Sequence, residues 1–118
     1  MPRFLRISAI LIAVCFAITF HACGKDFEAT RLAAQQGDAN AQFELGLMYF
    51  MGKVVPQNYV EAAKWYRLAA EQGHAKAQFN LGELYDLGLG VAQNYAEASK
   101  WYRSAKDPEF FAASKAAK

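Results

Sequence analysis

The sequence predicts an all-α fold, a short right-handed α-solenoid of antiparallel helix pairs, from three observations. First, residues 33–70 repeat as residues 69–106 after a shift of 36 positions, with 23 of 38 residues identical. Second, a period in the thirties is typical of stacked helix pairs. Third, the shared positions 41, 42, 45, 46 and 49 lie within about 140° of each other on a helix. Because one helix pair cannot bury its apolar face alone, we expect the two copies to stack.

A first helix is expected over residues 25–36. Its end, residues 31–37, matches residues 67–73, so this helix represents the second half of a repeat. Gly37 and Gly73 follow the expected helix ends, where a left-handed residue is favoured. The chain should therefore hold two full repeats flanked by terminal half-repeat helices.

The first helix of each repeat, the A helix, is expected over residues 39–51 and 75–87, with Asp38 and His74 at the N-cap position. The shared side chains should form its buried face: Ala41, Leu45, Gly46 and Tyr49, then Ala77, Leu81, Gly82 and Tyr85. A glycine inside a helix costs about 1 kcal/mol relative to alanine. Its recurrence at one position predicts a close neighbour, which we expect to be the tryptophan of the following helix.

The second helix of each repeat, the B helix, is expected over residues 59–72 and 95–106. Asn58 and Asn94 precede these helices, and a glutamate follows three residues later, as in a capping box. The expected buried residues are Ala62, Trp65, Ala69, Ala98, Trp101 and Ala105, and the expected solvated residues are Lys64, Arg67, Lys100 and Arg103.

Residues 107–118 are expected to form a C-terminal capping helix over about residues 108–117. Asp107 is suited to the N-cap, and Pro108 to the first helical position. Phe110 and Phe111 would then supply a bulky apolar contact at the open end of the stack, where repeat proteins need a terminal cap.

Residues 1–22 are typical of an export signal. Arg3 and Arg6 precede an uncharged run over residues 7–20, which is shorter than the roughly 20 residues that span a bilayer. The run ends before Cys23 in a sequence that resembles the lipobox of bacterial lipoproteins. We therefore expect Cys23 to be lipidated and residues 23–32 to contain the linker and the start of the first helix. Cleavage after Thr19 and an uncleaved anchor remain alternatives.

Composition excludes some classes of function. The net charge is +2, and removing residues 1–22 takes away two arginines, which leaves 11 basic and 11 acidic residues. A neutral chain lacks the basic surface of a nucleic-acid binder. His74 has no companion histidine, cysteine or cluster of carboxylates, and no metal-ligand or phosphate-loop pattern occurs. We therefore expect no enzyme activity, no cofactor and no metal site.

The repeats resemble the Sel-one-like repeats (SLR), which are relatives of the tetratricopeptide repeats. The shared pattern is A-Q-x-x-L-G-x-x-Y-x-x-G, then V, then N-Y-x-E-A-x-K-W-Y-R-x-A. It occurs twice within residues 33–106, once in each copy. The resemblance implies an adaptor between proteins. Some cysteine-rich members are associated with β-lactam binding or hydrolysis, so a small cell-wall-directed enzyme is the alternative. Those members carry a disulfide in every repeat, whereas Cys15 and Cys23 both precede the repeats here.

Positions that differ between the two copies suggest where a partner binds. In the A helices four of the differing positions, 40, 44, 47 and 51, fall within about 60° of each other, on a stripe that we expect to line the concave surface of the solenoid. Its residues are Asn40, Glu44, Leu47 and Met51, then Lys76, Asn80, Glu83 and Leu87. Leu47, Phe50 and Met51 could form an apolar patch there. The alternative is that these are ordinary solvated positions.

The sequence thus predicts an exported interaction module of the bacterial periplasm or cell envelope. It would be attached to the membrane through the N-terminal lipid or an uncleaved anchor. A protein or peptide would be the partner, and end-to-end association between copies is a further expectation.

Overall fold

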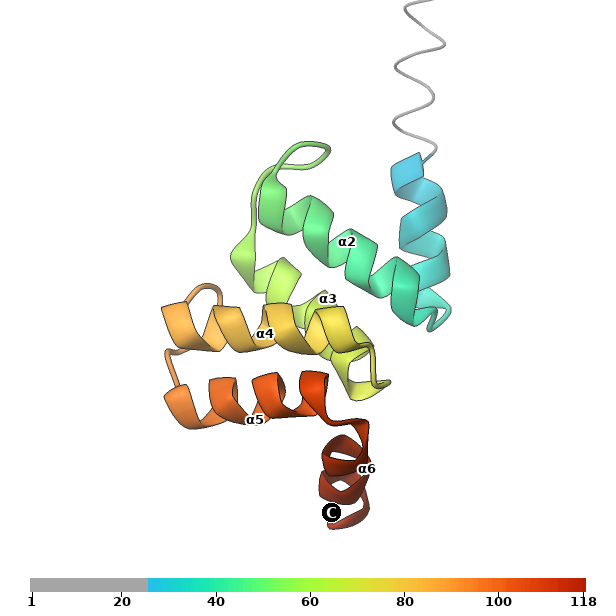
Figure 1. Cartoon of the computed structure of the whole chain (residues 1–118). Coiled ribbons are helices and arrows are strands. Elements are labelled where there is room, and N and C mark those ends of the chain that lie inside the picture. The colour runs from blue at the N-terminus through green and yellow to red at the C-terminus, as the bar shows by residue number, and fades with distance from the viewer. Residues whose placement is uncertain (1–25) are drawn as a thin grey trace, which may run out of the picture.

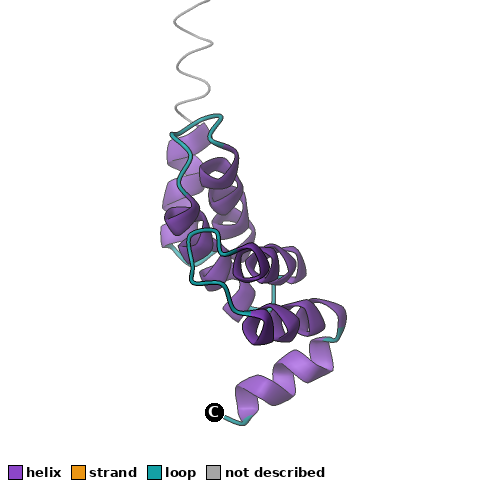
Figure 2. Ribbon diagram, turned by 90° about the vertical axis from the view of Figure 1, so that its left-hand side faces the viewer, coloured by secondary structure: helices purple, strands orange, loops and turns teal. Residues whose placement is uncertain are grey.

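The structure, a computed structural model, describes residues 26–118, and all regular secondary structure in this range is helical (Figure 2). A helix over residues 26–35 comes first. It is followed by α2 (Ala39–Met51), α3 (Tyr59–Glu71), α4 (Ala75–Leu87), α5 (Tyr95–Lys106) and α6 (Pro108–Ala116). Figure 1 shows α2 to α5 as successive layers of one stack. The predicted all-α solenoid of antiparallel helix pairs is confirmed; residues 1–22 and Cys23 lie outside the described residues.

The predicted helix starts are confirmed by their N-caps. A side-chain oxygen of Asp38 accepts a hydrogen bond from the amide of Ala41, and the Nδ1 of His74 accepts one from Ala77. Asn58 and Asn94 cap α3 and α5 in the same way. These caps satisfy amides that have no partner inside the helix, and so fix where each helix begins.

The A helices end where glycine permits a left-handed backbone. Gly52 and Gly88 adopt φ values of 67° and 68°, and each donates its amide back to the last turn of its helix. The predicted bounds of both A helices are confirmed. The first B helix, α3, ends at Glu71, one residue earlier than predicted.

Small residues let the helices approach closely. Ala62, Ala69 and Ala77 are fully buried in the main hydrophobic cluster, together with Leu81 and Leu84. Close packing of this kind makes the junction sensitive to the volume of each side chain.

Two buried glutamines repeat the same hydrogen bond in successive layers. Gln42 donates from Nε2 to the carbonyl oxygen of Ala34 over 3.1 Å, and Gln78 donates to that of Ala70 over 3.1 Å. The helix over residues 26–35 therefore sits against α2 as α3 sits against α4. This relationship confirms that it is the second half of a repeat.

The expected neighbour of the helical glycines was wrong. A Cβ added at Gly46 would lie 2.6 Å from Cδ1 of Tyr66, and one at Gly82 would lie 2.8 Å from Cδ1 of Tyr102. Consecutive residues on a helix point about 100° apart, so the tyrosine meets the A helix of its own repeat. The preceding tryptophan lies in a different cluster, where Trp65 packs beside Ala41 and Leu45 of α2 and Ala34 of the half-repeat helix before it.

The predicted exposures are only partly right. Trp101 is buried, but Tyr49, Trp65, Tyr85 and Ala105 are half-buried. Arg67 and Lys100 were expected in solvent and are also half-buried. The guanidinium carbon of Arg67 lies 5.6 Å from the ring centre of Tyr85, and its Nη2 donates to the Tyr85 hydroxyl. The next repeat therefore covers part of this arginine, which the pattern of a single helix does not reveal.

Candidate partner-binding face

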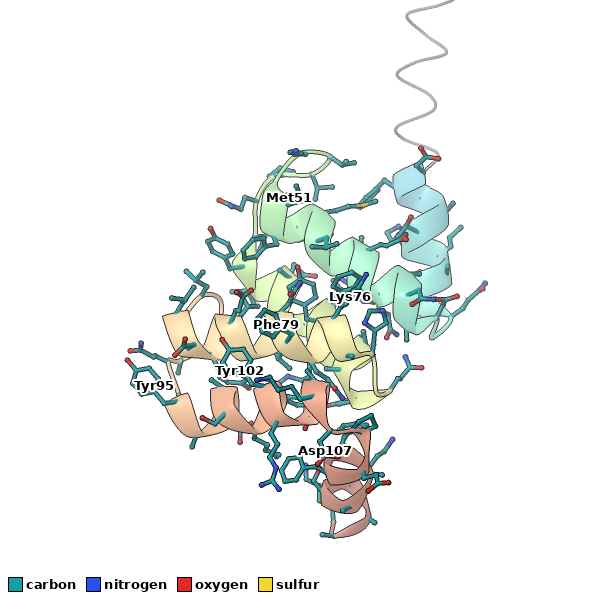
Figure 3. All side chains as sticks on the ribbon, viewed as in Figure 1. Met51, Lys76, Phe79, Tyr95, Tyr102 and Asp107 are labelled. Carbon is teal, nitrogen blue, oxygen red and sulfur yellow. The ribbon has the colours of Figure 1, made fainter. Side chains whose placement is uncertain are left out.

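The predicted stripe is a largely exposed surface on α2 and α4 (Figure 3). Six of its residues are exposed: Asn40, Glu44, Met51, Lys76, Glu83 and Leu87. Leu47 and Asn80 are half-buried. Met51 and Leu87 occupy equivalent positions one repeat apart and expose 49% and 64% of their surface.

His74 connects the two halves of the stripe. Its Nε2 lies 3.0 Å from Oδ1 of Asn40, and its ring stacks on Phe43 with the centroids 4.8 Å apart. Because Nδ1 accepts from Ala77, Nε2 carries the proton and donates to Asn40. Burial, and then the charge of Lys76, lower the pKa of His74, so the neutral ring is favoured.

Tyr66 of α3 is buried beneath the stripe. It is 1% exposed and packs between Gly46 of α2 and the buried face of α4. Burial raises the pKa of the Tyr66 hydroxyl, while the neighbouring Asn80 opposes this and Glu83 reinforces it. Asn80 is thus half-buried because it lies next to Tyr66.

The expected apolar patch at Leu47, Phe50 and Met51 was wrong. Leu47 and Phe50 are half-buried and pack against the main hydrophobic cluster. The Phe50 ring also meets Tyr59 edge-on, with centroids 5.4 Å apart. Only Met51 of the three is exposed, because the following repeat covers that side of α2.

The structure contains a pocket of about 560 Å³ that the sequence did not reveal. It lies away from the stripe, between α3, α5 and α6, and its lining includes Arg67, Glu71, Glu97, Lys100 and Lys115. The repeat pattern does not predict this pocket, because one of its walls is α6, which does not follow the repeat. Phe111 of α6 packs on Trp101, and its Cε1 lies 3.5 Å from where a Cβ on Gly73 would be.

Neither the stripe nor this pocket has the composition of a metal site. Among residues 26–118, no group of three or more histidine, cysteine, aspartate or glutamate side chains is placed to hold a metal ion. Within the same range no helix combines the length and apolar character needed to cross a membrane.

Two regions of the chain match a family model described as Sel1 repeat, residues 39–74 and residues 75–107. Together they cover more than half of the sequence. The chain belongs to the Sel1 repeat family. Proteins of this family are generally protein–protein interaction modules that bind protein partners on a non-catalytic scaffold. No curated protein matches the chain significantly.

Solved structures of Sel1 repeat proteins share the fold. A Sel1 repeat protein from Oxalobacter formigenes is 52% identical with a TM-score of 0.66, over 67% of this chain and 32% of that chain. A protective antigen of uropathogenic Escherichia coli with an SLR fold is 40% identical with a TM-score of 0.65, over 71% and 19%. Cysteine rich protein B of Helicobacter pylori is 28% identical with a TM-score of 0.68, over 70% and 62%. The chain thus spans less than two thirds of each of these proteins.

Proposed function

We propose that this Sel1 repeat chain binds a protein or peptide along the stripe formed by α2 and α4. The main support for this proposal is that Met51 and Leu87 are both exposed, since they are apolar side chains at the same position of successive repeats. Residues that both repeats share are used to join the helices, whereas the stripe differs between them. The stripe residues are not needed to join the helices, so they can differ according to the partner that is bound.

The chemistry of the stripe suits a partner that combines apolar and polar groups. Full burial of a methionine or leucine side chain contributes about 1.5–3 kcal/mol, so two such contacts would supply much of a moderate affinity. Asn40 and Glu44 lie on the same face of α2 as Met51, and Lys76 and Glu83 lie on the same face of α4 as Leu87. Interfaces between proteins usually combine apolar contacts with polar groups beside them.

Site-directed photo-crosslinking tests this proposal. A benzophenone side chain placed at position 51 or 87 should capture a cell-envelope protein, since both positions lie on the exposed stripe. The matched control is position 60, where Val60 is just as exposed but belongs to α3. Crosslinking from position 60 to the same protein, with none from 51 or 87, would contradict the proposed surface.

We also propose that the chain is exported and attached to the bacterial cell envelope through a lipid on Cys23. The positively charged start, the uncharged run over residues 7–20 and the cysteine that follows support this proposal. Metabolic labelling with a palmitate analogue should mark the wild-type chain and not the Cys23→Ser variant. An unlabelled wild-type chain would contradict lipidation and leave cleavage after Thr19 or an uncleaved anchor.

A further inference from the structure

The C-terminal end of the helix stack carries an uncovered copy of the junction that joins the two repeats. Inside the stack, the aromatic residues Phe43, Tyr59 and Tyr66 are covered by α4 and the loop after it. The His74 ring stacks on Phe43, and the backbone of Gly90 lies against that of Tyr59. This junction shows what kind of element the surface accepts, namely a helix.

One repeat later, the equivalent residues are open. Phe79 and Tyr95 are 47% and 65% exposed, and Tyr102 is half-buried, whereas its counterpart Tyr66 is fully buried. The last helix, α6, does not cover them, because its Phe111 packs on Trp101. We call Phe79, Tyr95 and Tyr102, together with Glu83 and Asp86, the end face.

The aromatic residues of the end face form a row along the seam of α4 and α5 (Figure 3). Tyr95 and Tyr102 are seven residues apart, so they project from the same side of α5 about 10 Å apart along its axis. The rings of Phe79 and Tyr102 lie 5.2 Å apart. A row of this length matches a helix of two to three turns.

The end face differs from the internal junction in charge. Leu47 and Phe50 of the first repeat are replaced by Glu83 and Asp86, which both lie in the C-terminal half of α4. Burial, Asp86 and Glu83 together raise the pKa of Tyr102, so the carboxylates lie near its hydroxyl. A wholly apolar helix would leave these carboxylates without partners, whereas a basic helix would pair with them.

We propose that the end face binds a helix of a partner protein that is apolar on one side and carries lysine or arginine in its C-terminal half. The internal junction gives the orientation, because α4 covers α3 while running parallel to α2. A helix placed in the same way on the end face runs parallel to α4. Its C-terminal half then lies beside Glu83 and Asp86, where the helix dipole also favours a cation.

Titration of the isotope-labelled full chain, in mild detergent, tests this inference by nuclear magnetic resonance. The probes are two helix-stapled peptides with the sequence of residues 73–91, one unchanged and one carrying Glu83→Lys and Leu87→Lys. The basic peptide should shift the signals of Phe79, Tyr95 and Tyr102 and bind at least about threefold more tightly at low salt. This preference should vanish in about 0.5 M salt because the charges are exposed.

Variants of the protein locate the contact. Asp86→Asn should weaken the basic peptide about threefold, and Phe79→Ser should weaken both peptides, with helical content checked by circular dichroism. The Val60→Ser protein is the control, because Val60 is exposed on α3 and lies outside both the stripe and the end face. Equal affinity of the two peptides, or shifts away from the end face, would overturn the proposal. Sedimentation showing a dimer of the chain alone, with Phe79 protected, would also overturn it in favour of a second copy as the occupant.

Discussion

Gly46 and Tyr66 are packed so closely that a Cβ on Gly46 would lie 2.6 Å from Cδ1 of the tyrosine ring. The same relationship recurs between Gly82 and Tyr102 at 2.8 Å. The two pairs differ in freedom, because Tyr66 is fully buried while Tyr102 is half-exposed. The two pairs therefore allow a direct comparison of the same glycine substitution against a buried tyrosine and against a half-exposed one.

Gly46→Ala should destabilise the protein by up to about 2 kcal/mol. Overpacking a filled core costs about 1–3 kcal/mol, and replacing a helical glycine offsets about 1 kcal/mol of this. Gly82→Ala should cost less, since Tyr102 can move toward solvent. Urea unfolding followed by circular dichroism measures both changes. A Gly46→Ala protein as stable as the wild type would contradict the close contact.

Gln78→Met should lower the free energy of unfolding by about 1–3 kcal/mol, because the buried carbonyl of Ala70 loses its side-chain donor. The control is Gln93→Met, which removes a donor from the carbonyl of Asp86 at the exposed surface. Water can replace that donor, so the change should be below about 1 kcal/mol. Equal losses in urea unfolding would show that burial does not determine the value of this hydrogen bond.

The stability of the protein should decrease on acidification partly through His74. Burial lowers the pKa of His74 in the folded chain below its ordinary value of 6.5, so the unfolded chain binds the proton more readily. The contribution is complete above pH 6.5 and is lost as the pH falls from there through the lowered pKa. His74→Asn keeps an N-cap without a titrating group, and thermal unfolding at several pH values should show a flatter profile over this window. An unchanged profile would assign the dependence to other groups.

Much of the fold follows from comparing the two copies, because repeated caps and glycines determine where helices begin and end. The bounds of α2 and α4 and the N-caps Asp38, Asn58 and Asn94 were predicted on this basis and are confirmed. The comparison could not decide whether Trp65 or Tyr66 meets Gly46, since both residues are shared between the copies. That choice depends on how neighbouring helices are rotated.

The sites show the same limit. Exposure of Met51 and Leu87 follows from positions that differ between the copies. Phe79 was missed because it is identical to Phe43, although only Phe43 is covered by a following repeat. The pocket beside α6 was missed because that helix departs from the repeat pattern. Sequence comparison identifies what a repeat needs, but not which copy lies at an end of the stack.

The most direct test of the central claim is the affinity of the captured partner for the Met51→Glu/Leu87→Glu double variant. Both side chains are exposed, so the fold should survive, and circular dichroism checks this. Since charged groups in an apolar contact are strongly unfavourable, we expect a loss of at least about tenfold, with Val60→Glu unchanged within about twofold. Undiminished binding by the double variant, or an equal loss with Val60→Glu, would contradict the account.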